Sequence, residues 1–281
     1  MTTSQKNGAA TKMLVAITGA NQGLGYYAAQ QMASSGKYHV LVGSRDIDKA
    51  NKAIEQMMSD DSYKVDKADL EPLQIDVNED ESIKAAAKSV EDKHGKLDIL
   101  MLNAGIAGAQ AASKNGIGPT LRELYQQHYD TNVFGAAVTV DAFLPLLRKS
   151  DEKRIGFTSS GLASLALAVD PSAHASYSAA MYPIYRSTKT AMNMTMAHYA
   201  RLLETEGFIV SASDPGYCGE LPRKIKSLYL VLTSLTATNL NNHQGFKDPR
   251  DGCKALIIAA TGPKEKVHAR MVDDQGKAVP W

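Results

Sequence analysis

Short apolar runs alternate with longer amphipathic segments along the first part of the chain. The runs do not alternate between apolar and polar positions as a half-exposed strand would. Such runs are typical of strands that are buried on both faces of a parallel sheet. Gly36 and Gly95 stand where two of the intervening helices should end. We expect strands over residues 13–17, 39–42, 73–75 and 97–102, and helices over residues 26–35, 48–58 and 79–94.

The same alternation continues in the second part of the chain. Helical spacing covers residues 121–147, and a strand follows at 154–158. A long helix is expected over 184–204 and a sixth strand over 208–212. Strands separated by helices in this way predict an α/β fold: a doubly wound, Rossmann-type parallel sheet with helices on both faces and right-handed connections.

The rest of the pattern favours one domain in a reducing compartment. No repeat, linker or low-complexity block divides the chain, so residues 1–281 are expected to form a single domain after a polar arm at 1–12. The arm has no apolar segment of a secretory signal, and no run approaches the roughly 18 apolar residues of a membrane span. Cys218 and Cys253 are too few for a disulfide scaffold and lack zinc-site spacing. We expect a cytoplasmic protein with no membrane association and no metal site.

The net charge of the chain limits the kinds of partner that it can bind. Thirty-one Lys and Arg residues stand against 30 Asp and Glu residues, a formal net charge of +1. This balance provides no overall field that would hold nucleic acid or an acidic membrane. A small-molecule substrate is therefore expected, with no nucleic-acid partner.

A glycine-rich turn follows the first strand. The sequence TGANQGLG covers residues 18–25 and leads into the first helix. Glycines let the backbone approach a ligand closely, and the amides and dipole at a helix N-terminus favour an anion such as phosphate. Glycines also end strands for purely structural reasons, and that alternative stays open here. The candidate cofactor contacts in this turn are Gly19, Asn21, Gly23, Leu24 and Gly25.

The tip of the second strand favours a particular dinucleotide. Ser44 and Arg45 stand where an acidic residue would bind the 2′-hydroxyl of NAD. A guanidinium suits a 2′-phosphate, so we favour NADP(H) as the cofactor. Two alternatives remain: Arg45 as a solvated surface charge, or Arg45 neutralised by Asp46. Further candidate cofactor contacts follow the third and fourth strands, at Asp76, Val77, Asn103, Ala104 and Gly105.

The candidate chemistry lies on the helix expected over 184–204. Tyr185 and Lys189 are four residues apart and share a helix face. A phenol has a pKa near ~10, and a neighbouring cation is expected to lower that pKa and make the phenol a usable acid or base. Such a pair also arises in unrelated helices. Ser159 and Ser160 close the fifth strand, where a hydroxyl could orient a substrate oxygen.

Taken together and in order, these motifs resemble the short-chain dehydrogenase/reductase family over nearly the whole chain. The resemblance is closest to NADPH-dependent, carbonyl-reductase-like members. It implies that Tyr185 is the general acid/base, that Lys189 lowers its pKa and holds the nicotinamide ribose, that Ser160 rather than Ser159 polarises the carbonyl, and that Asn132 anchors a water relay. The matching motifs are TGANQGLG (18–25), Asp76-Val77, NAG (103–105), Asn132, Ser160, YRSTK (185–189) and Pro215-Gly216.

Two segments depart from the family pattern. Residues 161–181 lengthen the gap between Ser160 and Tyr185 and are expected to form part of the substrate wall; His174 within them is interpreted as a surface histidine. The threonine expected soon after Pro215-Gly216 is found only as Thr238, after the segment 219–236. That segment is either a lid over the substrate or an accidental insertion such as translated intron sequence, so Thr238 is a conditional cofactor ligand.

These features predict an NADPH-dependent oxidoreductase that reduces a ketone or aldehyde to an alcohol, or catalyses the reverse reaction. The alternative is a non-catalytic NADP-binding regulatory or scaffold protein whose activity the segment 219–236 has impaired. The family resemblance also implies a homodimer or homotetramer.

Overall fold

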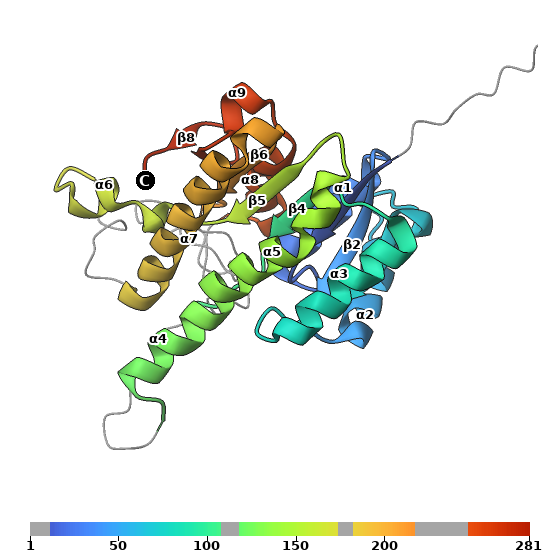
Figure 1. The fold of residues 1–281 in the computed structure, drawn as a ribbon, viewed down its shortest axis with the longest axis horizontal. Helices are drawn as coiled ribbons and strands as arrows, with labels where there is room; N and C mark the ends of the chain where they lie inside the picture. Colours follow the sequence, from blue (N-terminus) through green and yellow to red (C-terminus); the bar gives the residue numbers. More distant parts are fainter. Residues whose placement is uncertain (1–11, 108–117, 174–181, 217–246) are drawn as a thin grey trace, which may run out of the picture.

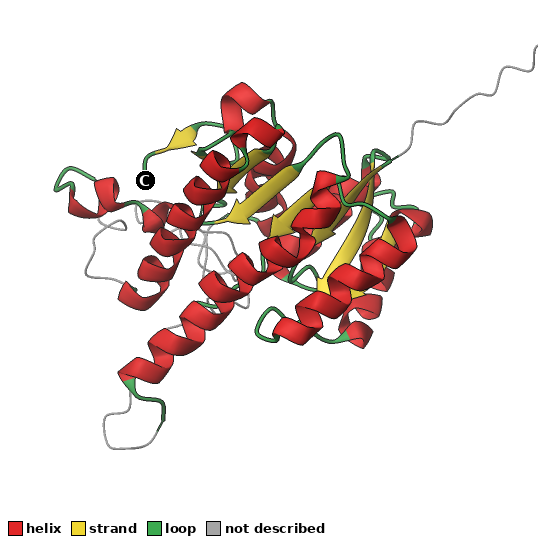
Figure 2. Ribbon diagram, viewed as in Figure 1, coloured by secondary structure: helices red, strands yellow, loops and turns green. Residues whose placement is uncertain are grey.

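The strands form one twisted sheet with helices on both faces (Figures 1 and 2). A computed structural model describes residues 12–107, 118–173, 182–216 and 247–281. Within these ranges the sheet has eight strands in the order β3-β2-β1-β4-β5-β6-β7-β8. All neighbouring pairs are parallel except β7 and β8. The strands are β1 (Met13–Ile17), β2 (Tyr38–Ser44), β3 (Leu70–Gln74), β4 (Ile99–Leu102), β5 (Arg154–Thr158), β6 (Ile209–Ser213), β7 (Met271–Val272) and β8 (Ala278–Val279).

The strand order fixes where a ligand can bind. The chain builds outward from β1 to β3, then crosses back so that β4 pairs with the other side of β1. Connections from β1 and β4 therefore leave in opposite directions at the carboxyl ends of the strands. This divergence opens the crevice in which doubly wound sheets bind nucleotides.

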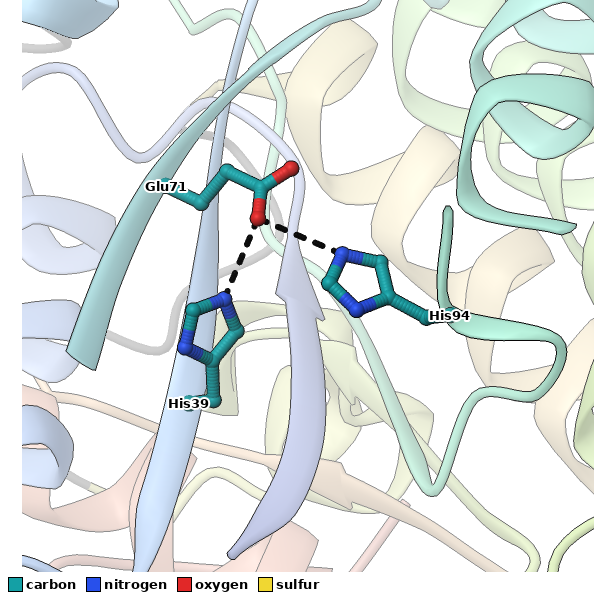
Figure 3. A group of neighbouring side chains, drawn as sticks. All are labelled: His39, Glu71 and His94. Carbon is teal, nitrogen blue, oxygen red and sulfur yellow. Dashed lines mark hydrogen bonds and ion pairs between the residues drawn. The ribbon is translucent and has the colours of Figure 1, made fainter. Parts of the chain in front are cut away.

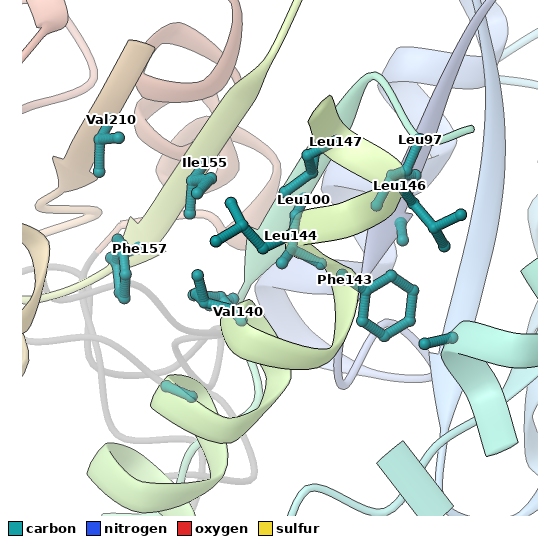
Figure 4. Packing of buried hydrophobic residues seen from close by; sticks show 14 of the residues in the cluster. Leu97, Leu100, Val140, Phe143, Leu144, Leu146, Leu147, Ile155, Phe157 and Val210 are labelled. Carbon is teal, nitrogen blue, oxygen red and sulfur yellow. The ribbon is translucent and has the colours of Figure 1, made fainter. Parts of the chain in front are cut away.

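Two helical layers cover the sheet, and the strand residues divide between them. In β1, Leu14 and Ala16 pack into the core under α3, α5 and α7, whereas Val15 and Ile17 pack into the core under α1, α2 and α8. Successive side chains along a strand point to opposite faces of the sheet, so an unbroken apolar run contributes side chains to both cores. Figure 4 shows the first core, where helix and strand side chains meet. The helices are α1 (Gly23–Ser34), α2 (Ile47–Ser59), α3 (Asp80–His94), α4 (Leu121–Tyr129), α5 (Gly135–Arg148), α6 (Leu165–Val169), α7 (Pro183–Leu202), α8 (Pro249–Thr261) and α9 (Lys264–Val267).

The predicted fold class is confirmed, and the six predicted strands are all present within a few residues of their expected bounds. The helix expected over 121–147 is interrupted: α4 and α5 are joined by a π-helical turn at Asp130–Phe134. Asn132 in this turn forms hydrogen bonds with Ile106 and Thr188, which are distant in sequence, as described below. No helix in the described ranges is long and apolar enough to cross a bilayer.

The C-terminal elements α8, β7 and β8 were not predicted. The two strands contain two residues each, too short to show a hydrophobic period. Helix α8 did carry a signal: Asp248 caps it by accepting from the Arg250 N–H, Pro249 occupies its first turn, and an apolar run follows. It packs beside α1 and contributes Cys253 and Leu256 to the core.

Candidate active site

The glycine turn of residues 18–22 connects β1 to the N-terminus of α1. Gly19 and Gly23 have φ angles of +64° and +61°, a region that other residues adopt only with strain. A Cβ on Gly25 would lie 2.7 Å from the Gly19 carbonyl oxygen, so only glycine fits there. The first turn of α1 contains no acidic residue, which leaves the positive end of its dipole available to an anion. Leu24 packs its side chain against the core under α1.

Two side chains lock this turn to the end of β4. The Thr18 hydroxyl accepts hydrogen bonds from the backbone N–H groups of Asn103 and Ala104, both at 3.0 Å. The Asn103 amide donates to the carbonyl oxygens of Thr18 at 2.9 Å and Gly19 at 3.0 Å. The predicted motifs 18–25 and 103–105 are therefore parts of one structure. Thr18 was not predicted as a site residue, although it begins the glycine motif.

The end of β2 presents an exposed arginine. Ser44 is buried, and its hydroxyl accepts from the Asp46 N–H at 3.3 Å. Asp46 caps α2, accepting from the N–H groups of Asp48 and Lys49, and its other oxygen lies 3.6 Å from the Lys49 ammonium. The Asp46 carboxylate is thus engaged by α2, and Arg45 stands exposed at the strand tip.

Asp76 and Val77 follow β3 at the same edge of the sheet. The Asp76 N–H donates to the Ser82 hydroxyl at 2.9 Å, and its carboxylate accepts from the Asn78 N–H at 3.0 Å. Val77 is buried against Gly135, where a Cβ would lie 2.3 Å from the Val77 carbonyl oxygen. This contact holds the β3 edge against α5.

Tyr185, Ser160 and Lys189 come together at the ends of β5 and α7. The half-buried Tyr185 side chain is hydrogen-bonded to the Ser160 side chain. The Lys189 ammonium, on a side chain that is 3% exposed, lies 5.7 Å from the Tyr185 ring centroid and donates to the Thr158 carbonyl oxygen at 2.7 Å. Ser159 turns the other way, since its hydroxyl donates to the buried Asn193 side chain at 2.6 Å.

Burial shifts two pKa values in this group. Burial raises the pKa of Tyr185; the hydrogen bond with Ser160 opposes this shift, and the nearby Asp214 adds to it. The phenol therefore keeps its proton at neutral pH. Burial lowers the pKa of Lys189 itself to about 8.

Asn132 connects three segments around Lys189. Its fully buried amide accepts from the Ile106 N–H at 2.7 Å, and donates to the Ile106 carbonyl at 2.8 Å and to the Thr188 hydroxyl at 3.0 Å. A Cβ on Gly105 would lie 3.2 Å from the Asn132 side-chain oxygen and 3.5 Å from the Lys189 ammonium. The π-helical turn that contains Asn132 thus brings the β4 edge and α7 together. Such turns often occur at functional sites.

Asp214 is a site residue that the sequence analysis did not single out. It is 8% exposed and accepts hydrogen bonds from the backbone N–H groups of Gly161 and Gly216, while burial raises its pKa. Pro215 and Gly216 follow it, and Gly216 has a φ of +66°. The carboxylate fixes the loop after β6 against the loop after β5. The signal was its position directly before the predicted Pro215-Gly216 motif.

The remaining predicted residues lie outside the described ranges. They are Thr238 and the segment 219–236, together with His174, Cys218 and residues 1–11 of the N-terminal arm.

Comparisons with known proteins agree with this arrangement. The family model described as short chain dehydrogenase matches residues 13–220. The short-chain dehydrogenase anuI of Penicillium roqueforti (strain FM164) is 41% identical over 278 residues, covering 97% of this chain and 98% of that protein. The short-chain dehydrogenase/reductase eupG of Phoma sp is 34% identical over 229 residues, covering 75% of this chain and 79% of that protein.

The fold also matches a solved structure. NADPH-bound carbonyl reductase from chicken fatty liver superposes with a TM-score of 0.71 at 22% identity, covering 96% of this chain and 100% of that one. A sheet in the order 3-2-1-4-5-6, a glycine turn locked to the β4 edge and a Tyr-Ser-Lys group at the β5 edge accompany these sequence matches. The chain belongs to the short-chain dehydrogenase family, a family of oxidoreductases.

Proposed function

We propose that this oxidoreductase uses NADPH to reduce the carbonyl of a small ketone or aldehyde to an alcohol. The observation that carries the proposal is the Tyr185 phenol, hydrogen-bonded to Ser160 and beside the buried Lys189. The group lies at the carboxyl edge of the sheet, where doubly wound folds bind their ligands.

The residues of the crevice fit a phosphorylated dinucleotide. The positive φ angles of Gly19 and Gly23 open the backbone at a helix N-terminus that contains no acidic side chain in its first turn. Arg45 is exposed at the β2 tip, and the carboxylate of Asp46 pairs with Lys49 on α2 rather than with Arg45. The Arg45 guanidinium is therefore suited to a 2′-phosphate. The chicken reductase with a similar fold holds NADPH, which supports the same choice here. NADPH would supply the hydride when bound.

The protein's own residues would supply the proton and orient the substrate. Because burial raises its pKa, Tyr185 is protonated at neutral pH and can donate to a carbonyl oxygen that gains negative charge. Ser160 would donate a second hydrogen bond to the same oxygen and so stabilise the charge that develops in the transition state. Asn132 would act by positioning, since its amide is used in bonds to Ile106 and Thr188.

The test compares Tyr185→Phe with a control on the same helix. A panel of ketones and aldehydes is assayed by NADPH consumption, and NADPH binding is measured by fluorescence. Tyr185→Phe should lower kcat by at least about a hundredfold while the Kd for NADPH changes by no more than about twofold. Tyr199→Phe removes a hydroxyl that contacts only a carbonyl at 3.5 Å among the described residues, and should keep full activity.

Two outcomes would reject the proposal. Full activity of Tyr185→Phe would show that Tyr185 is not the proton donor. NADPH binding by the wild-type protein without turnover of any carbonyl would favour the non-catalytic NADP-binding alternative.

A further inference from the structure

His39, Glu71 and His94 form a cluster far from the proposed catalytic group. His39 is the second residue of β2, Glu71 is the second residue of β3, and His94 is the last residue of α3. The cluster therefore lies at the amino ends of these parallel strands, opposite the edge that carries Tyr185. Figure 3 shows both imidazole rings directed at one carboxylate oxygen.

The three side chains present ligand atoms to one point. Nε2 of His39 and Nε2 of His94 each lie 3.2 Å from Oε2 of Glu71. One ligand atom from each residue lies within 4.8 Å of the other two. Two atoms that bind a tetrahedral zinc ion at about 2.1 Å lie about 3.4 Å from each other. The spacing in the cluster is close to that of ligands around a single ion.

Hydrogen bonding indicates which nitrogen of each histidine is available to a cation. Nδ1 of His39 lies 2.9 Å from the Ala68 carbonyl oxygen, which can only accept, so Nδ1 carries the proton. In the neutral ring Nε2 then holds a lone pair, and this lone pair faces the carboxylate of Glu71. His94 Nε2 is buried and has no hydrogen bond of good geometry among the described residues. A positive centre between these atoms would remove the repulsion.

We propose that His39, Glu71 and His94 bind a divalent transition-metal ion, Zn²⁺ best, with a water molecule as the fourth ligand. Two imidazoles and one carboxylate suit zinc better than Mg²⁺ or Ca²⁺. The bond from His39 to Ala68 is the outer contact that typically fixes a metal-binding ring. Lys93 holds the other Glu71 oxygen at 2.8 Å, and the C-terminal end of the α3 dipole favours a cation.

The ion would have a structural role. It would join the end of α3 to β2 and β3, which already pair as neighbouring strands, and it would add to the Lys93–Glu71 ion pair that links α3 to β3.

The test uses full-length protein without a histidine tag, stripped of metal and titrated with Zn²⁺ in a calorimeter. One equivalent should bind, and Tm should rise by about 5 °C at free Zn²⁺ near 100 times Kd. Co²⁺ at the same site should give visible absorption bands. His39→Gln and His94→Gln should each weaken binding by at least about tenfold, while His198→Gln, an exposed histidine on α7, should not.

Circular dichroism of each variant checks that it folds, and having two separate ligand variants keeps the test informative if one does not. The proposal is overturned if Zn²⁺ does not saturate one site, or if His94→Gln and His198→Gln bind it equally. It is also overturned if acidification alone stabilises the protein and Zn²⁺ has no effect, because the cluster would then be an ion pair of two protonated histidines with Glu71.

Discussion

At the scale of single residues, the proposed active site contains charged and polar groups that are buried at a cost in stability. Lys189 is 3% exposed, yet it carries an ammonium whose described hydrogen-bond partners are a carbonyl oxygen and a thioether sulfur. Burial lowers its pKa to about 8, so the folded state disfavours the charged form. Retaining such a residue against stability is typical of a functional site.

Replacing Lys189 should therefore stabilise the protein while abolishing activity. Below pH ~8 the charged lysine opposes folding by roughly 3 kcal/mol, from which the lost hydrogen bond subtracts about 1 kcal/mol. Lys189→Met should thus be about 2 kcal/mol more stable near pH ~7 in urea unfolding. Between about pH 8 and 10.5 the unfolded lysine binds a proton that the folded one does not, so wild-type stability should rise with pH there and the variant's should not. A less stable variant at neutral pH would contradict this assignment.

The choice of cofactor also belongs to the residue scale. If Arg45 pairs with a 2′-phosphate, Arg45→Ala loses a charge-assisted hydrogen bond of about 1.5–3 kcal/mol. The KM for NADPH should then rise at least about tenfold, while the KM for NADH changes by no more than about twofold. Lys49→Ala, which removes an exposed cation paired with Asp46, is the matched control. An equal effect on both cofactors would reject the phosphate contact.

At the scale of elements, the junction of α4 and α5 contacts α7, the helix that carries the proposed catalytic tyrosine. The π-helical turn Asp130–Phe134 widens the helix at Asn132, whose amide then reaches both Ile106 and Thr188. Thr188 donates to the Tyr185 carbonyl at 2.7 Å, so the contact continues into the helix turn that carries the phenol. The π-helical turn thus connects the loop after β4 to α7, and we call this connection the Asn132 bracket.

Removing this bracket should impair both stability and catalysis. Asn132→Ala leaves the Ile106 N–H and carbonyl without their partner, which should lower the free energy of unfolding by about 3 kcal/mol. Because α7 shifts relative to the β4 edge, kcat should fall by about tenfold or more. Urea unfolding and NADPH consumption measure the two effects. Gln126→Ala, on the exposed side of α4, should change neither, and an unaffected Asn132→Ala would show that the bracket is unimportant.

At the scale of the whole molecule, the sheet separates two kinds of chemistry. Its carboxyl edge collects the glycine turn, Arg45 and the Tyr185 group, while its amino edge carries the histidine-glutamate cluster. Two buried cores lie between the edges, one under each helical layer. Parallel topology is the cause, because each of the strands β1 to β7 places its carboxyl end on the same side.

Much of this was predictable from local patterns. The apolar runs correctly predicted β1 to β6, because strands that are buried on both faces have unbroken apolar sequences. The spacing of Tyr185 and Lys189 predicted that they share one helix face, and both residues lie in helix α7. The π-helical turn was not predictable in this way, because it depends on hydrogen bonds between Asn132 and residues that are distant in sequence.

The sequence by itself determined the fold class and the glycine turn, because both rest on composition and short-range spacing, and its resemblance to the short-chain dehydrogenase/reductase family indicated the set of residues that carry the proposed chemistry. Only the tertiary structure decided how those residues interact. It gave the Lys189 ammonium the Thr158 carbonyl oxygen as an acceptor, raised the pKa of Tyr185 by burial, and engaged Asp46 with α2. It also brought together His39, Glu71 and His94, which no sequence spacing connects. Burial and long-range contacts depend on how distant segments pack, and that information exists only once the chain has folded.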